Sequence, residues 1–573
     1  MCGFICLWQP SGVCKKDAQM SLSAISHRGP DFSKIIYEEN GNLALGHQRL
    51  SILDLSNNGN QPMKSRDEKI ITIYNGEIYN YRELSREYNI TLETRCDTEL
   101  LTEFFSRQDI DCLNKLNGMF SGVIYSKDKK TLTLFRDRFG IKPLFYTFTK
   151  DGGFAIASEI KALLELKNVY KSPNLNVIRT FLDLSLYDHS EETFFEGIFS
   201  LEQGSYAILD LKNSKFFKKK WYSLPERISN NSNNFSESEA IEYGKYLIQE
   251  CVNSNLLSDV SVGINISGGV DSSLLSSTAS KKIKDLNLLT MDFGDIYSEF
   301  EWVELNKKYG NITKIDVDLD SLDLRLKKVI KMQDQPFGGI TVLGYDNLYE
   351  VAKKKSIKVL LDGNGIDEIF LGYTKYNFSD KHGNLSIDGT KPNQPEIISE
   401  DLRNNSKIID VPEFDLDIPN YRKASIQDLL YKKIPRNLRF NDLASMAHSC
   451  ELRVPFLDYR LVEFGFSLPY SFLKDEIHSK KIVRKICANL VNPKVAYAKK
   501  RSVQSPQREI LANEWQEKIK NIIEDGITKK RGWLDLNYVR NYYQNYITSK
   551  PNNSFPIWQI LNLELWAREW FDK

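Results

Sequence analysis

The chain has 573 residues, with 77 Lys and Arg against 76 Asp and Glu, which gives a formal net charge of +1 at pH 7. This balance argues against a general polyanion-binding surface, so we expect no nucleic-acid partner. No apolar run approaches the roughly 18 residues that span a bilayer, and we therefore expect no membrane partner and a cytoplasmic location. The length exceeds the usual limit of one hydrophobic core and predicts two or three domains.

A cysteine at position 2 directly follows the initiator methionine. Once that methionine is removed, the cysteine carries a free α-amine with a pKa of about 7.7–8, which can accept the proton of its own thiol. Cys2 is therefore a candidate nucleophile that brings its own general base. Taken alone, it also fits a small buried cysteine near an N-terminal strand.

The first 225 residues show the pattern of short strands separated by turns, which predicts a β-rich sandwich with few helices. The basic, aromatic run at 215–221 is expected to be an edge strand. A polar, low-complexity stretch at 229–235 then interrupts the pattern. We place a linker at 226–236, which leaves domains of 1–225 and 237–573. The strands predicted in the first domain cover 70–74, 122–125, 132–135, 154–157 and 206–209.

Six motifs follow Cys2 in the first domain, at 27–31 (His-Arg-Gly-Pro-Asp), 46–52, 74–80, 96–99, 136–140 and 157–161. In this order they resemble the class II glutamine amidotransferases, the N-terminal-nucleophile glutaminases. The resemblance implies glutamine as a substrate. Arg49 would grip its α-carboxylate in a bidentate fork, and Asp97 or Glu77 would bind its α-ammonium.

Attack of Cys2 on the glutamine amide would create an oxyanion. The side chain of Asn75 and the N–H of Gly76 are the expected donors to it, and Asn75 is also counted among the glutamine-binding residues. The alternatives are structural: Asn-Gly is a common hairpin turn, and Arg49 would be an ordinary surface ion-pair partner.

After the linker, strands alternate with helices, which predicts a doubly wound parallel sheet with ligands at the carboxyl ends of its strands and further helices at the C-terminus. The whole chain is thus expected to combine an α+β and an α/β domain. The predicted elements are strands at 262–266, 287–293, 312–317 and 357–362 and helices at 273–282, 299–309, 321–333 and 344–355.

A glycine turn at 267–273 (Ser-Gly-Gly-Val-Asp-Ser-Ser) joins the first of these strands to a helix. Glycines let the backbone approach an anion, and the helix start offers free N–H groups, so the turn is a candidate phosphate cradle. Asp271 would need a Mg²⁺ between itself and a polyphosphate. The turn resembles the pyrophosphate loop of the N-type ATP pyrophosphatases; the alternative is a plain turn with capping serines.

A second glycine loop, at 362–368 (Asp-Gly-Asn-Gly-Ile-Asp-Glu), follows the last strand. Asp367 would share Mg²⁺ with Asp271, and Asp362 with Gly363 would border the nucleotide. The basic triplet at 499–501 would face a leaving pyrophosphate, or else form a solvated surface.

Together these features resemble the asparagine synthetase family over nearly the whole chain. The resemblance implies ATP as co-substrate, Mg²⁺ held by Asp271 and Asp367, Lys500 facing the reacting phosphate, and an internal path for ammonia. It assigns Ser267, Gly268, Gly269, Asp271 and Ser272 to the pyrophosphate and Ile266, Phe293 and Gly363 to the nucleotide.

Two segments depart from the pattern of enzymes that amidate aspartate. Asn364 stands where the family has a glutamate, and an amide cannot accept a proton. The segment 337–341 (Phe-Gly-Gly-Ile-Thr) lacks the arginine expected to bind a second carboxylate. A polar segment at 377–422 is predicted to be a surface excursion that covers the acceptor.

The resulting hypothesis is a glutamine-dependent amidotransferase of the asparagine synthase type. Ammonia from glutamine attacks an acyl-adenylate, releasing AMP, and the acceptor is formally aspartate. The rival acceptor is a sugar uronic acid of surface-polysaccharide biosynthesis. Two further alternatives are a ring-closing synthetase with an inactive glutaminase and a regulatory protein without turnover. A homodimer is compatible with the sequence, which does not fix the oligomeric state.

Overall fold

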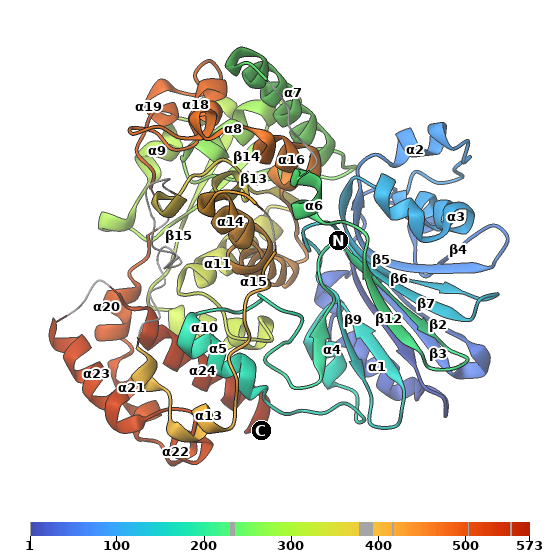
Figure 1. The fold of residues 1–573 in the computed structure, drawn as a ribbon, viewed down its shortest axis with the longest axis horizontal. Helices are drawn as coiled ribbons and strands as arrows, with labels where there is room; N and C mark the ends of the chain where they lie inside the picture. The colour runs from blue at the N-terminus through green and yellow to red at the C-terminus, as the bar shows by residue number, and fades with distance from the viewer. Residues whose placement is uncertain are drawn as a thin grey trace.

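The computed structural model describes residues 2–229, 235–376, 394–414, 417–501, 504–549 and 553–572. It has an antiparallel β-sandwich at the right of Figure 1 and a helix-covered parallel sheet at the left. Both predicted fold classes are confirmed. None of the described helices is long and apolar enough to cross a membrane. All eight cysteines are free, and only Cys14 is exposed.

The sandwich consists of two six-stranded antiparallel sheets, with strand orders β10-β8-β9-β1-β3-β2 and β12-β11-β7-β6-β5-β4. β12 lies at an edge, as the run at 215–221 predicted. The strands are β1 (Gly3–Trp8), β2 (Phe32–Glu38), β3 (Leu43–Arg49), β4 (Met63–Lys64), β5 (Ile70–Ile78), β6 (Gly118–Ser126), β7 (Thr131–Arg136), β8 (Phe145–Phe148), β9 (Phe154–Ala157), β10 (Ile198–Ser200), β11 (Ser205–Asp210) and β12 (Phe216–Lys220).

Helices cover the outer faces of this sandwich, which the sequence pattern did not predict. In β5, Ile71 and Ile73 pack into the core between the sheets, whereas Tyr74 and Ile78 pack outward against helix α3. Side chains alternate between the two faces of a strand, so a strand buried on both faces is apolar at nearly every position. Such a strand shows no polar face in its sequence, and the pattern alone does not tell which face helices cover. The helices of this half are α1 (Lys15–Ser23), α2 (Tyr81–Glu87), α3 (Asp97–Gln108), α4 (Ile160–Leu164), α5 (Leu175–Leu184) and α6 (Leu224–Ser229).

The second half is built on five parallel strands in the order β15-β14-β13-β16-β17. Successive residues of one strand enter different cores: Leu288 packs with helices α7 and α8, and Leu289 with α10 and α11. The sheet is therefore covered on both faces, as predicted. The strands are β13 (Val262–Asn265), β14 (Asn287–Asp292), β15 (Asn311–Asp316), β16 (Val359–Leu361) and β17 (Glu451–Arg453).

The helices around this sheet include several short segments. The helix predicted at 273–282 begins earlier, at Val270, because Gly269 is its N-cap. The helices are α7 (Glu237–Asn255), α8 (Val270–Ala279), α9 (Phe300–Glu304), α10 (Leu322–Met332), α11 (Thr341–Lys354), α12 (Ile366–Ile369), α13 (Glu400–Asn404), α14 (Asn420–Gln427), α15 (Ile434–Met446), α16 (Tyr459–Ser467), α17 (Tyr470–Leu473), α18 (Lys481–Cys487), α19 (Pro493–Ala496), α20 (Gln507–Ala512), α21 (Gln516–Glu524), α22 (Gly526–Arg531), α23 (Leu536–Ser549) and α24 (Phe555–Phe571).

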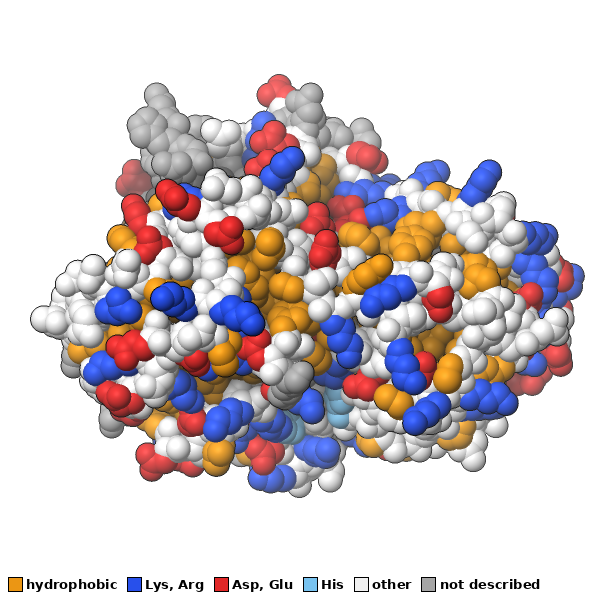
Figure 2. Space-filling view, turned by 90° about the horizontal axis from the view of Figure 1, so that it is seen from below, with side chains coloured by type: hydrophobic (Ala, Val, Ile, Leu, Met, Phe, Trp, Pro, Cys, Tyr) orange, Lys and Arg blue, Asp and Glu red, His pale blue; other side chains and the backbone are white. Residues whose placement is uncertain are grey.

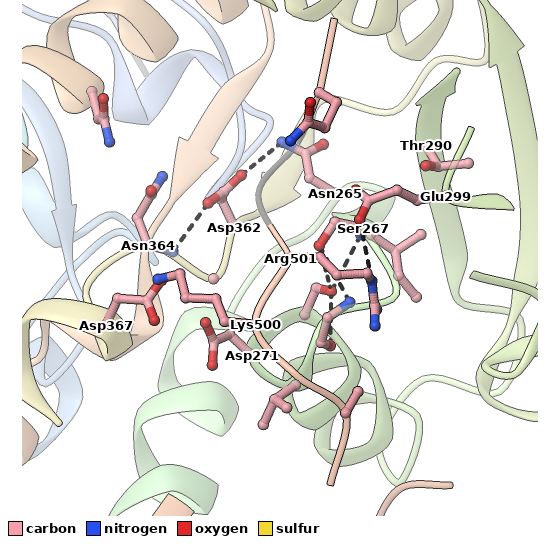
Figure 3. A pocket seen from close by; sticks show the side chains of 18 of the residues that line it. Asn265, Ser267, Asp271, Thr290, Glu299, Asp362, Asn364, Asp367, Lys500 and Arg501 are labelled. Carbon is pink, nitrogen blue, oxygen red and sulfur yellow. Dashed lines mark hydrogen bonds and ion pairs between the residues drawn. The ribbon is translucent and has the colours of Figure 1, made fainter. Parts of the chain in front are cut away.

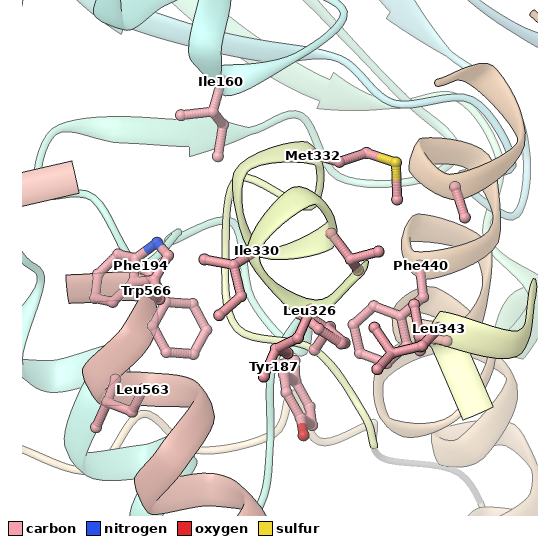
Figure 4. Packing of buried hydrophobic residues seen from close by; sticks show 14 of the residues in the cluster. Ile160, Tyr187, Phe194, Leu326, Ile330, Met332, Leu343, Phe440, Leu563 and Trp566 are labelled. Atoms are coloured by element: carbon pink, nitrogen blue, oxygen red, sulfur yellow. The ribbon is translucent and has the colours of Figure 1, made fainter. Parts of the chain in front are cut away.

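One hydrophobic core joins the two halves. Ile160 and Phe194 of the first half belong to the same buried cluster as Leu326 and Ile330 of α10 and Trp566 of α24 (Figure 4). The Trp566 indole also donates a hydrogen bond to the carbonyl of Asp334 at 2.7 Å. A shared core fixes the two halves in one relative position, so their sites keep a defined separation.

Parts of the predicted linker and of the predicted acceptor cover, namely 230–234, 377–393 and 415–416, lie outside the described residues. The domain boundary therefore stays a prediction. Of the segment 377–422, residues 394–414 and 417–422 are described. In the portion 394–414, the carbonyls of Arg403 and Ser406 accept hydrogen bonds from Arg179 of α5 at 2.8 and 2.7 Å, which ties this portion to the first half.

The face seen from below carries charged side chains of both signs, with hydrophobic side chains between them (Figure 2). This interspersion is the arrangement that a net charge of +1 leads one to expect.

Candidate active sites

The first candidate site is a small cavity of about 30 Å³ beside Cys2 in the sandwich. It brings together Cys2, which directly precedes β1, and residues of β3, β5 and α3 that are far apart in the sequence. Its walls include Cys2, Arg49, Gly76, Glu77 and Asp97. The glutamine-site residues predicted from the sequence thus meet at one place, with Asn75 adjacent on β5.

Cys2 is held by the neighbouring strand. Its backbone N–H donates to Oδ1 of Asn75 at 3.0 Å, and the Nδ2 of Asn75 is buried without a partner among the described residues. Burial raises the pKa of the Cys2 thiol, while the amino terminus, the N–H of Leu50 and the Arg49 guanidinium act to lower it. A buried donor left unpaired beside a nucleophile fits a developing oxyanion.

Asn75 and Gly76 lie inside β5, so the hairpin-turn alternative is wrong. A Cβ added at Gly76 would come within 2.1 Å of the carbonyl oxygen of Met119 on the paired strand. Glycine is therefore required by the close approach of two strands.

Arg49 is 4% exposed and is not a surface ion-pair partner. Its guanidinium donates to the carbonyls of Ser56 (2.6 Å) and Asp54 and to Oδ1 of Asn60 (2.8 Å). These partners and the carbonyl of Leu53 are neutral and leave the positive charge uncompensated, but they occupy both Nη atoms, so a carboxylate could bind both Nη atoms only after some of these bonds break.

Two buried carboxyl groups face this cation across the cavity. Asp97 accepts hydrogen bonds from the Tyr74 hydroxyl (2.5 Å) and the Ile78 N–H (2.8 Å). Burial raises the pKa of Asp97 and, more strongly, that of Glu77, where Asp97 raises it further and Arg453 opposes the rise.

The sequence analysis missed two residues of this site. Glu451 lines the cavity, and Arg453 pairs with Glu77 at 3.3 Å, although both belong to β17 of the second half. No local pattern reveals a partner 376 residues away.

The second candidate site is a cavity of about 650 Å³ at the carboxyl ends of β13, β14 and β16 (Figure 3). The glycine loops after β13 and β16 lie side by side there, as expected for a parallel sheet. Of the predicted residues, its walls include Ile266, Ser267, Gly269, Asp271, Ser272, Phe293, Asp362, Gly363, Asp367 and Lys500.

Gly268 does not line this cavity but shapes its loop. Its φ of +68° favours glycine, and an added Cβ would lie 2.6 Å from the backbone carbon of Trp302. Its carbonyl accepts a hydrogen bond from Arg501 at 3.1 Å. Beside it, the N–H of Ser267 donates to Oγ of Ser272 at 3.2 Å, which closes the turn.

Asp271 and Asp367 lie together, as predicted, and a lysine lies between them. Nζ of Lys480 is 2.9 Å from Asp271 and 2.9 Å from Oδ1 of Asp367, whose Oδ2 is 2.8 Å from Lys500. Burial acts to raise the pKa of Asp367, but these ammonium groups hold it well below its usual range.

No group of three or more His, Cys, Asp or Glu side chains is placed to hold a metal within the described ranges. Mg²⁺ is commonly bound by one or two carboxylates together with substrate phosphates, so the two aspartates fit it as partners of a bound nucleotide.

The walls of the cavity also carry Asn364, Glu368, Tyr373 and Lys433. The Tyr373 hydroxyl donates to Glu368 at 3.1 Å, and Nζ of Lys433 lies 3.1 Å from the centre of the Tyr373 ring. Burial lowers the pKa of Lys433 to about 8, although Glu368 opposes this shift.

The segment 337–341 does not line the cavity. Phe337 is buried, and its N–H donates to Asn562 of α24 at 2.8 Å. The N–H of Ile340 donates to Gln507 at 3.0 Å. The arginine that the sequence lacks is therefore missing from a segment outside the cavity wall.

A buried N-terminal cysteine with an unpaired amide donor and a glycine-rich nucleotide loop together define a glutamine-hydrolysing, amide-forming ligase. Sequence comparison agrees with this class: a glutamine amidotransferase domain matches residues 1–222, and the asparagine synthase family matches residues 244–568. The chain belongs to the asparagine synthase family.

Three relatives illustrate the range of similar proteins. Asparagine synthetase (glutamine-hydrolyzing) 1 of Bacillus subtilis is 28% identical over 99% of this chain and 96% of its own length. Asparagine synthetase (glutamine-hydrolyzing) 2 of the same organism is 29% identical over 81% of this chain and 66% of its own length. Amidase chyE of Penicillium rubens is 25% identical over 93% of this chain and 90% of its own length.

Proposed function

We propose that this protein converts aspartate to asparagine, with glutamine as the ammonia donor and ATP as the activating co-substrate. The observation that carries this choice of acceptor is that a cation, Lys433, and a carboxyl group, Glu368, lie in the same cavity as the pyrophosphate loop. An amino acid acceptor presents a carboxylate and an ammonium, and this cavity offers a partner for each.

In the first step, Arg49 binds the α-carboxylate of glutamine, and Asp97 with Glu77 binds its α-ammonium. The Cys2 thiol transfers its proton to the α-amine and attacks the carboxamide carbon. The side-chain amide of Asn75 and the N–H of Gly76 stabilise the oxyanion. The proton returns to the leaving nitrogen, ammonia departs, and water hydrolyses the thioester to glutamate.

In the second step, the acceptor carboxylate attacks the α-phosphorus of ATP and displaces pyrophosphate. The turn at 267–272 holds the phosphates with backbone N–H groups and hydroxyls, and Lys500 compensates the charge that develops on them. Ammonia that has crossed the shared interface then attacks the acyl-adenylate and displaces AMP.

Asp271 and Asp367 are the residues that would hold Mg²⁺ beside the phosphates. Bound there, the ion would neutralise phosphate charge during the displacement.

The rival acceptor, a sugar uronic acid, is favoured by Asn364, whose amide lies in the cavity where hydroxyl groups would need donors and acceptors. Against it, both Lys433 and Lys500 lie over the Tyr373 ring, at 3.1 and 3.4 Å from its centre, which leaves that ring unavailable for stacking on a sugar. The relatives include proteins named asparagine synthetase and one named amidase, so their names leave both acceptors open.

Pyrophosphate release with ATP, Mg²⁺ and glutamine tests the proposal when aspartate is compared with uronic acids and nucleotide-linked uronates. We expect release and asparagine with aspartate. Turnover with a uronate alone would move the acceptor to the rival class. The Cys2→Ala variant should lose glutamine-dependent synthesis and keep ammonia-dependent synthesis; unchanged glutamine use would contradict the role of Cys2, and no release with any acid would favour a regulatory protein.

A further inference from the structure

We propose that Arg453, on strand β17 of the synthetase half, is a positioning residue of the glutamine site: its guanidinium holds the carboxyl group of Glu77 in place for the α-ammonium of glutamine and opposes its protonation. The glutaminase site would then be complete only when the second half is docked on it. This inference rests on the proposed glutamine-binding role of Glu77.

The guanidinium of Arg453 is anchored on its own half and reaches across the interface. Nε lies 2.5 Å from Glu451, and Nη1 donates to the carbonyls of Asn255 and Leu257 at 2.8 and 2.7 Å. Nη2 is the atom that reaches Glu77, at 3.3 Å. The side chain is fully buried, so no water competes for this contact.

Glu77 needs such a partner because of its surroundings. It is buried beside Asp97, and both effects favour its protonated form. The groups that face it are Asp97 of α3, Tyr74 of β5, Tyr79, Glu451 and Arg453 of β17, and the amino terminus. Arg49 lines the same cavity, but its guanidinium donates to neutral oxygens, so Arg453 is the permanent cation in direct contact with Glu77 among the described residues. Without Arg453, the pKa of Glu77 would rise further, and its attraction for an ammonium would weaken.

The same residue touches the nucleotide side through its backbone. The N–H of Asp362 donates to the carbonyl of Arg453 at 2.9 Å, and β16 pairs with β17 at Leu361 and Arg453. One residue therefore connects the loop that borders the nucleotide with the pocket that binds glutamine.

The test measures glutamine hydrolysis as a function of pH in wild-type protein and in Arg453→Met. We expect the variant to raise the KM for glutamine about tenfold or more at pH 7, the effect of at least one pKa unit at Glu77, with a smaller change in kcat. The fall of KM with rising pH should be displaced to higher pH in the variant than in the wild type, because Glu77 without Arg453 ionises only at a higher pH.

Ammonia-dependent pyrophosphate release serves as the folding readout and should persist. Lys358→Met is the matched control, since it removes another ion pair between the halves, with Asp31 at 2.8 Å, at a more exposed position. It should leave the KM for glutamine unchanged. An Arg453→Met protein with wild-type KM and pH profile would overturn the inference.

If Arg453→Met also loses ammonia-dependent synthesis, the KM for glutamine of the Arg453→Lys variant tests the inference instead. Lysine keeps the charge but lacks the planar fork that contacts Glu451 and Glu77 together, so the KM for glutamine should still rise. An unchanged KM in this folded variant would overturn the inference. A wild-type protein without Cys2-dependent glutamine hydrolysis would instead overturn the proposed function, which separates the two failures.

Discussion

Nζ of Lys480 lies 2.9 Å from both carboxylate oxygens of Asp271. The same atom contacts Asp367, so an ammonium group occupies the position between the two carboxylates assigned to Mg²⁺. A cation can reach both aspartates only after Lys480 moves, for example toward the phosphates of an arriving nucleotide. If Asp271 and Asp367 hold Mg²⁺ as proposed, we therefore expect ordered binding, in which the metal enters together with ATP.

Replacing Lys480 by methionine should open this position to metal without nucleotide. The two aspartates would then repel each other, and Mg²⁺ would relieve the repulsion. We expect millimolar Mg²⁺ to raise the Tm of Lys480→Met by about 2 °C or more, with little effect on the wild type.

Thermal unfolding without ATP measures this effect, and binding of Mn²⁺ followed by electron paramagnetic resonance gives a second readout. Lys481→Met is the control, because Lys481 pairs with Glu237 away from the two aspartates. Equal Mg²⁺ responses in the wild type and Lys480→Met would show that Lys480 does not exclude the metal.

Asn75→Ala should lower the kcat for glutamine hydrolysis by about 10²–10³-fold, the usual effect of removing one oxyanion donor. The buried Nδ2 has no other partner among the described residues, but Oδ1 accepts from the Cys2 N–H, so a loss beyond this range would include misplacement of Cys2. Steady-state glutaminase kinetics measure the effect, with ammonia-dependent pyrophosphate release as the control. A raised KM at unchanged kcat would assign Asn75 to substrate binding alone.

Gly268→Ala should impair the synthetase and spare the glutaminase. The left-handed backbone costs a non-glycine residue about 1–2 kcal/mol. The contact with Trp302 adds a cost of about 1–3 kcal/mol unless the loop moves. We expect pyrophosphate release to fall at least about tenfold, since each 1.4 kcal/mol is a factor of ten.

The control for this substitution is Gly526→Ala, whose added Cβ would meet nothing within 4 Å. It should leave both activities unchanged. Wild-type pyrophosphate release by Gly268→Ala would mean that the loop tolerates a different shape.

Lys433 should give acceptor binding an alkaline limit. Burial lowers its pKa to about 8, so its ammonium is present below that pH and is lost above it. If Lys433 binds the α-carboxylate of aspartate, the KM for aspartate must rise above about pH 8. Lys433→Arg keeps its charge in this range and should remove that rise.

The measurement is the KM for aspartate against pH at saturating ammonia, which bypasses glutamine. Lys433→Met should show a high KM at every pH. The same alkaline rise in wild type and Lys433→Arg would assign the titration to another group.

Much of the architecture was predictable because it depends on local pattern. The run 262–266 and the turn after it fixed the position of the nucleotide loop, and the order of motifs placed Cys2, Arg49 and Asp97 in one half. These signals lie within a few residues of each other or follow from strand alternation.

The remaining features depend on contacts that local pattern does not encode. Lys480 stands in a lysine-rich stretch in which nothing distinguishes it from the half-buried Lys481 or Lys485. Asn75 and Gly76 have the composition of a turn, yet they lie in a strand because β6 pairs along the whole of β5. The segment 337–341 was expected at the acceptor, but contacts with α24 and Gln507 hold it away from the cavity.

The position of β17 has a consequence for exchanging domains between family members. This strand is hydrogen-bonded into the synthetase sheet, yet Glu451 lines the pocket around Cys2. A chimera assembled by cutting near residue 226 would transplant an incomplete glutaminase, because part of its pocket stays behind with the recipient. Modular swaps in this family should therefore succeed only when the strand equivalent to β17 is matched to the incoming partner, and the pair would have to evolve as one unit.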